Sequence, residues 1–172
     1  TATYPLFTER RFGYGAEQNG YIFAFQGLLG AILQGMMLGW LVKRFKEKPL
    51  VVAGVLVLSA GMWLLPSSAT IAMLLATTAV TGLGHGLLAA PLNGIASKAV
   101  DERAQGRAMG AMQSAASLAR IVGPVLGGAL LHADAAGSTS QFGRTPYWAG
   151  AFIMVLALGL SANLKEIRTD AA

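Results

Sequence analysis

A single charged residue lies deep within one of the long apolar runs of this chain. Arg120 is the only Asp, Glu, Lys or Arg between Ala108 and His132, a run of 25 residues. If that run crosses a bilayer, a charge near its centre costs about 2.5–3.5 kcal/mol on insertion scales and persists where it faces a cavity or a partner. Gln113 lies seven residues earlier, on nearly the same helix face. We therefore expect a polar stripe that meets a polar or anionic substrate or an acidic residue elsewhere; a salt bridge that locks the helix bundle is the alternative.

Four further polar side chains lie inside apolar runs. Gln26 and Gln34 are eight residues apart on one side of a helix, and they either join helices by hydrogen bonds or line a cavity. His85 stands among glycines, where an imidazole with a pKa of about 6.5 suits proton coupling, although simple packing is the commoner role. Asn93 follows Pro91 and either satisfies the carbonyl group that the proline leaves free, which is the commoner role, or binds substrate. With Arg120 and Gln113, these side chains are the substrate-binding or coupling candidates.

No set of residues for catalysis or metal binding emerges from the sequence. The chain has two His and no Cys, which excludes a disulfide framework and a thiolate metal site. Paired carboxylates within a span and a glycine-rich loop after a strand are also missing from the sequence. We therefore expect no enzyme activity, no catalytic residues, no metal and no cofactor.

The polar candidates sit within segments long enough to cross a membrane. No charged residue occurs in 18–42, 49–97 or 145–164, and about 20 mainly apolar residues span a hydrocarbon core. The run of 49 residues suits two spans, divided at Pro66-Ser67-Ser68. A soluble amphipathic helix would show a polar stripe, which 51–65 lacks. The sequence thus predicts an all-α membrane protein with five complete transmembrane helices, at about 18–42, 49–66, 69–97, 106–132 and 146–164.

Composition supports the same class. Hydrophobic residues make up 54% of the 172 residues and charged residues 12%, against about a quarter charged in soluble domains. So apolar a chain is not disordered. The net charge of +5 admits a nucleic-acid partner, but the charges lie in short clusters between apolar runs. We therefore expect residues 1–172 to form a single transmembrane domain that lies in a lipid bilayer and binds no nucleic acid.

The distribution of Lys and Arg predicts the orientation, because these residues accumulate in cytoplasmic loops. Nine of the 13 lie in 43–48, 98–107 and 165–168, which share one side if the spans alternate. The opposite side holds three: Arg10, Arg11 and Arg144. We therefore expect the two basic connections and the C-terminus in the cytoplasm, and the residue 1 end outside or buried near the outer surface.

Three short segments resemble motifs of one membrane-protein family. The first, 39–48 (GWLVKRFKEK), is similar to the degenerate second copy of the loop motif G-x-L-a-D-r-x-G-r-k, through Gly39, Lys43, Arg44 and Lys48. Lys43 replaces the acidic residue, so its capping role is not carried over. The second matches the spacing of the antiporter motif G-x8-G-x3-G-P-x2-G-G, with Ala119 in place of one glycine, in Gly110, Gly123, Pro124, Gly127 and Gly128. The third, 97–110, resembles the connection between the tenth and eleventh helices.

Together these segments resemble the C-terminal half of a major facilitator superfamily transporter, from the end of helix seven to the tail after helix twelve. The nearest likeness is the drug:proton antiporter branch. The resemblance implies a six-helix bundle that carries a small molecule by alternating access. It also implies proton-coupled multidrug efflux in a bacterial inner membrane, with the N-terminal half, a small-molecule substrate and protons as partners. A proline that kinks a helix beside small glycines suits a gating helix, while plain helix packing is the alternative.

The beginning of the chain also bears on what the protein is. Residues 1–7 (TATYPLF) look like the end of another helix, and there is no initiator Met or signal peptide. We therefore expect a fragment or a truncated product. The alternative to transport is a truncated or assembly-only membrane protein without transport activity of its own.

Overall fold

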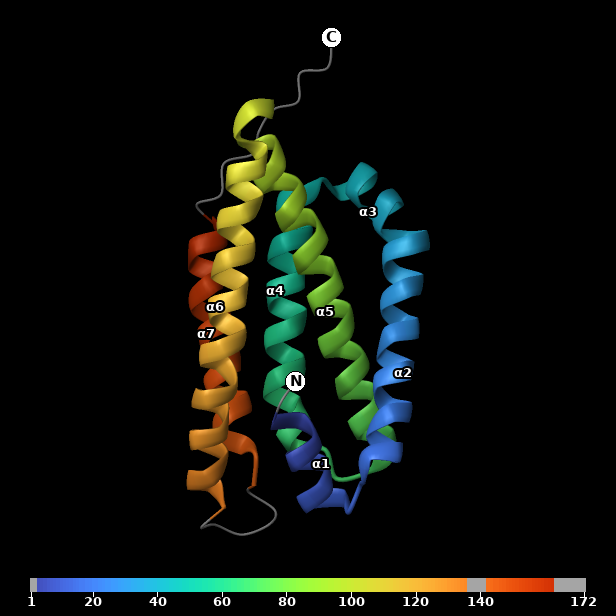
Figure 1. The fold of residues 1–172 in the computed structure, drawn as a ribbon. Helices are drawn as coiled ribbons and strands as arrows, with labels where there is room; N and C mark the ends of the chain where they lie inside the picture. Colours follow the sequence, from blue (N-terminus) through green and yellow to red (C-terminus); the bar gives the residue numbers. More distant parts are fainter. Residues whose placement is uncertain (1–2, 136–141, 163–172) are drawn as a thin grey trace.

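The computed structural model describes residues 3–135 and 142–162, and these residues form helices joined by short turns (Figure 1). In chain order the elements are α1 (Thr3–Phe12), α2 (Ala16–Ile32), a π-helical segment (Leu33–Met37), α3 (Leu38–Phe45), α4 (Glu47–Leu64), a 3-10 turn (Leu65–Ser67), α5 (Ile71–Lys98), α6 (Glu102–Asp134) and α7 (Arg144–Ala162).

The predicted all-α membrane fold is confirmed. Within the described residues, four helical stretches are long and apolar enough to cross a membrane: Ala16–Phe45, Glu47–Ser67, Ile71–Lys98 and Glu102–Asp134. Two of these extend past the predicted spans 18–42 and 106–132 at both ends. Charged residues mark where a helix leaves the hydrocarbon, whereas backbone hydrogen bonding continues beyond that point. The predicted span 146–164 and the tail run beyond the described residues.

Local chemistry explains where the helices begin and end. Thr70 precedes α5, and its Oγ1 accepts a hydrogen bond from the backbone N–H of Met73 at 3.2 Å, which caps the helix. The helix is interrupted between α3 and α4 at Lys46, whose φ of 63° lies in the left-handed region that non-glycine residues rarely adopt. The predicted turn at Pro66-Ser67-Ser68 corresponds to the 3-10 turn Leu65–Ser67.

Glycines bring α4 and α5 into backbone contact at the centre of the bundle. A Cβ atom added to Gly54 would lie 2.6 Å from the backbone nitrogen of Leu88, and one added to Gly61 would lie 2.9 Å from that of Thr81. Side chains larger than hydrogen at these positions would force the helices apart. In Figure 1, α2 and α6 stand on opposite sides of this central pair.

The helices alternate in direction, so that the connections gather at two ends (Figure 1). One end holds α1, the turn between α4 and α5, and the start of α7. Phe7 is fully buried there among Tyr4, Leu74, Leu131 and Tyr147. The other end holds the turn from α3 to α4 and the turn from α5 to α6. The basic connections 43–48 and 98–107 therefore share one end, and Arg10, Arg11 and Arg144 lie at the other.

Candidate functional site

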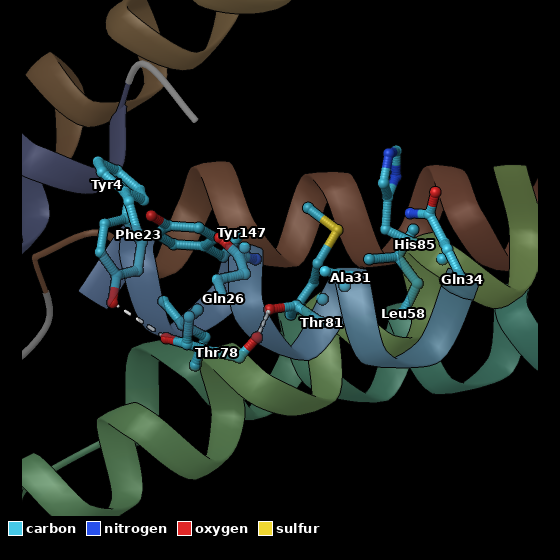
Figure 2. Close-up of a pocket in the computed structure, with 16 residues that line it drawn as sticks. Tyr4, Phe23, Gln26, Ala31, Gln34, Leu58, Thr78, Thr81, His85 and Tyr147 are labelled. Atoms are coloured by element: carbon cyan, nitrogen blue, oxygen red, sulfur yellow. Dashed lines mark hydrogen bonds between the residues drawn. The ribbon is translucent and has the colours of Figure 1, made fainter. Parts of the chain in front are cut away.

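A cavity of about 580 Å³ opens between α1, α2, α4, α5 and α7. Its walls are largely apolar, with Phe23, Leu58 and Met62 among them, and glycines of α2 and α5 leave room for it. Figure 2 shows polar side chains of both α2 and α5 at its wall. Among the described lining residues none is Asp, Glu, Lys or Arg. The cavity thus offers amide, hydroxyl and imidazole groups within an apolar enclosure.

Two predicted candidates line the cavity: Gln26 of α2 and Gln34 of the π-helical segment that follows α2. Gln26 also lies where α2 and α5 come close, since a Cβ atom added to Gly82 would lie 3.1 Å from the Gln26 Cγ. A third candidate, His85 of α5, lies near Gln34 at one end of the cavity (Figure 2). The structure therefore brings three of the six polar candidates to one space.

Gln34 lies in the π-helical segment Leu33–Met37, which the sequence analysis did not find. Such a segment inserts an extra residue into a helical turn, and these segments are frequent at functional sites. Leu33 is buried against α5, where a Cβ atom added to Gly86 would lie 2.7 Å from the Leu33 Cδ2. The sequence LQGMM is compatible with an ordinary α-helix, so the local sequence does not indicate the π turn.

The polar row on α5 also includes two threonines that sequence analysis missed. Thr81 Oγ1 donates to the carbonyl oxygens of Thr77 and Thr78, at 3.1 and 2.8 Å. Both Thr78 and Thr81 line the cavity with His85. The spacing of three and four residues between them places them on one helix face. That spacing was the available signal, but threonines that bond to their own helix are common in apolar spans.

Two tyrosines close the other end of the cavity. The Tyr4 hydroxyl lies 3.0 Å from the Thr78 Oγ1, within hydrogen-bond distance (Figure 2). The Tyr147 hydroxyl is buried and makes no hydrogen bond within the described residues, although Thr3 approaches it. Phe7 packs edge-on against the Tyr147 ring, with centroids 5.5 Å apart. The sequence analysis named neither Tyr4 nor Tyr147 as a candidate.

The structure does not bring Arg120, Gln113 or Asn93 to this cavity. Arg120 and Gln113 are exposed on α6, and Asn93 is exposed on α5. On α6 the neighbouring Leu118 and Ile121 are also exposed, at 62% and 68%. The polar stripe therefore lies on an open face of the chain, and its role stays a prediction.

The residues of the two predicted motifs lie apart from the cavity as well. Helix α6 continues through Pro124, and Gly110, Gly123 and Gly128 have open space where a side chain would begin. Gly127 is closer, with Thr3 Cγ2 3.0 Å from an added Cβ. Of the loop-motif residues, Gly39, Lys43 and Arg44 lie in α3, and Lys48 lies in the first turn of α4. Next to Lys48, Glu47 forms an ion pair with Lys98, with 2.9 Å between Glu47 Oε1 and Lys98 Nζ, and this pair joins α4 to α5.

The family profile described as Major Facilitator Superfamily matches residues 1–167. The chain belongs to the major facilitator superfamily. This match confirms the resemblance seen in the short motifs, and it indicates a family of transporters rather than of enzymes. Within the described residues no group of three or more His, Cys, Asp or Glu side chains is placed to hold a metal ion.

Curated relatives of this superfamily member carry names from drug resistance and solute transport. It is 31% identical over 121 residues to the tetracycline resistance protein, class D, of Salmonella ordonez, covering 70% of this chain and 30% of that protein. It is 27% identical over 172 residues to multidrug resistance protein 2 of Bacillus subtilis (strain 168), covering 98% of this chain and 40% of the relative.

A mammalian relative, solute carrier family 22 member 18 of Rattus norvegicus, is 35% identical over 120 residues, covering 67% of this chain and 28% of that protein. The superfamily chain thus spans less than half the length of these relatives. No solved structure gives a significant match.

Proposed function

We propose that this superfamily member carries a small molecule across the membrane as part of a larger transporter. The observation that carries the proposal is the cavity of about 580 Å³ within a bundle of apolar helices. Its volume falls within the range of about 300–1,000 Å³ typical of small-molecule sites. Gln26, Gln34 and His85 supply hydrogen-bonding groups that the bilayer itself does not offer. The cavity then forms one wall of the substrate site.

The chemistry of the wall favours an amphipathic substrate. The apolar and aromatic surface suits a largely apolar ligand, and the amide and hydroxyl groups fix its orientation. Drug efflux is supported by the names of the tetracycline and multidrug resistance relatives. Proton coupling is proposed for the same site, where His85 supplies an imidazole group, which can both accept and donate a proton.

Alternating access requires a second bundle that moves against this one around a shared central site. The open faces of α2 and α6 are consistent with such a partner, since Leu28 of α2 is 61% exposed and Val125 of α6 is 69% exposed. We propose that the N-terminal half of the transporter covers part of these faces and that lipid covers the rest. The bacterial relatives and the clustering of Lys and Arg support an inner-membrane protein with its C-terminus in the cytoplasm.

The test compares matched substitutions in the full-length protein. Gln26→Leu removes an amide from the cavity wall, and Gln105→Leu removes one from the exposed surface of α6. Everted membrane vesicles would be assayed for uptake of tetracycline and of a panel of amphipathic dyes, normalised to folded protein. We expect Gln26→Leu to lower transport about tenfold, because one lost hydrogen bond to substrate costs about 1–1.5 kcal/mol. Equal transport by the two variants would exclude the cavity as the substrate site.

A further inference from the structure

A second hollow lies on the other side of α4 from the cavity. It is a groove of about 500 Å³ between α4 and α7, which we call the α4–α7 groove, lined by Leu56, Ser59, Ala60, Trp63, Leu64, Ala151, Phe152 and Val155. Leu56, Trp63 and Phe152 are each more than half exposed. Its single hydroxyl, Ser59 Oγ, already donates to the Ala151 carbonyl oxygen at 3.2 Å. The groove therefore offers an occupant mainly apolar surface.

A cationic group lies beyond the Trp63 end of the groove. The indole rings of Trp63 and Trp148 stack, with centroids 5.1 Å apart and planes 17° from parallel, and Trp148 Nε1 donates to the Trp63 carbonyl oxygen at 3.3 Å. The guanidinium carbon of Arg144 lies 5.7 Å from the centroid of the Trp148 ring. Tryptophan rings are typical of the membrane–water interface, where lipid headgroups lie.

Arg144 forms no ion pair with a described residue. Its Nε is buried and makes no hydrogen bond within the described residues. The nearby carboxylate of Asp134 is engaged by the backbone N–H and the hydroxyl of Thr145. Arg11 lies close enough for its charge to repel that of Arg144. A phosphate at this place would neutralise the charge of the half-buried Arg144 guanidinium and relieve the repulsion between the two guanidinium groups.

The distance along α7 matches the depth of one lipid leaflet. Arg144 and Val155 are eleven residues apart, and at about 1.5 Å per residue they are separated by roughly 16 Å along the helix. Half of a hydrocarbon core of about 30 Å is about 15 Å. We propose that Arg144 binds the phosphate of an anionic phospholipid whose acyl chain lies in the α4–α7 groove. This lipid site is separate from the cavity and independent of the transport proposal.

The test measures lipid binding by the full-length protein in delipidated detergent solution. Native mass spectrometry would count bound dioleoyl phosphatidylglycerol and dioleoyl phosphatidylcholine, and thermal unfolding would follow the shift in Tm with each lipid or with inorganic phosphate. We expect phosphatidylglycerol to bind and to raise Tm more than phosphatidylcholine, and inorganic phosphate to leave Tm unchanged. Arg144→Gln should weaken phosphatidylglycerol binding at least fivefold, while Arg144→Lys keeps most of it.

Two further variants separate the headgroup from the acyl chain. Arg103→Gln removes an exposed cation from the opposite end of the bundle and should leave phosphatidylglycerol binding unchanged. Ala60→Phe fills the groove from an exposed position and should weaken the binding of both lipids. Equal losses from Arg144→Gln and Arg103→Gln would overturn the assignment of Arg144. Full binding by Ala60→Phe, or an equal Tm shift with inorganic phosphate, would overturn the acyl-chain site.

Discussion

The hydroxyl oxygens of Tyr4 and Thr78 lie 3.0 Å apart and join α1 to α5 at one end of the cavity. The two residues are 74 positions apart in sequence, so this bond exists only in the folded bundle. The Tyr4 ring also packs against Phe23 of α2, with centroids 5.6 Å apart. The Tyr4 side chain therefore joins α1, α2 and α5 at this end of the cavity.

Tyr4→Phe should loosen this closure without unfolding the protein, because the ring remains and only the hydroxyl is lost. A net loss of about 1 kcal/mol for one hydrogen bond corresponds to roughly a fivefold change in the ratio of open to closed states. The labelling rate of Met62→Cys, a half-buried position on the cavity wall, should rise about fivefold with an aqueous maleimide. Ala115→Cys on exposed α6 serves as the control and should label at the same rate with and without Tyr4→Phe. A rise at both positions would indicate general loosening instead.

The parts of the fold that follow from hydrophobicity were predictable from sequence. The run without charges from 49 to 97 had to contain two spans, since one span needs only about 20 residues. A helix that crosses a bilayer must satisfy its backbone internally, so an apolar run of that length predicts a helix whatever packs against it. The extra turns at 43–45 and 102–105 were missed because charged residues end the hydrocarbon contact and not the helix.

The candidate site was only partly predictable, for a different physical reason. Gln26 and Gln34 stood out because an amide in an apolar run needs a partner, and the helical period placed both on one face. Tyr147 carries no such mark, since tyrosine is ordinary near a span end. Its place at the cavity depends on where α7 packs against α1. The π turn around Gln34 lies beside the contact of Leu33 with Gly86, and the local sequence indicates neither of them.

Gly84→Ala should lower the stability of the bundle. A Cβ atom at Gly84 would lie 2.7 Å from the Cα of Leu58, and because that atom is backbone, α4 and α5 would have to separate. Overpacking of this kind costs about 1–3 kcal/mol, so we expect a clear fall in the Tm of the full-length protein in detergent. Gly110→Ala is the matched control, since nothing lies within 4 Å of its added Cβ. The control should equal or exceed wild type, because alanine favours a helix over glycine by about 1 kcal/mol. Equal Tm values for the two variants would contradict the close contact of α4 and α5.

The orientation in the membrane can be tested with two matched alanines in turns. Ala69 lies exposed in the turn between α4 and α5, and Ala99 lies exposed between α5 and α6 at the opposite end. From the positions of Lys and Arg we expect a membrane-impermeant thiol reagent to label Ala69→Cys in intact cells and Ala99→Cys only after permeabilisation. This chain has no cysteine of its own to contribute background. The opposite labelling pattern would reverse the predicted topology.

Substitutions of Arg120 can show whether its charge acts in transport or only stabilises the structure. Arg120 is exposed on α6 and forms no ion pair with a described residue. We therefore expect its partner outside the described part of the chain. In the full-length protein, Arg120→Ala should abolish or strongly reduce transport while membrane insertion persists, because removing a charge from a span makes insertion easier. Arg120→Lys should retain part of the activity if a point charge suffices, and none if a bidentate contact to a carboxylate or an anionic substrate is needed.

A structural salt bridge at Arg120 predicts a different pattern of results. The Arg120→Ala variant would then show less protein in the membrane and a lower Tm, but unchanged transport per folded molecule. Arg107→Ala, which removes another exposed cation of α6, controls for general effects of charge loss on that helix. Transport normalised to folded protein decides between the two roles. If Arg120→Ala stays within about twofold of wild type, a difference of roughly 0.4 kcal/mol, the guanidinium does not act in transport and its role is packing against the partner bundle.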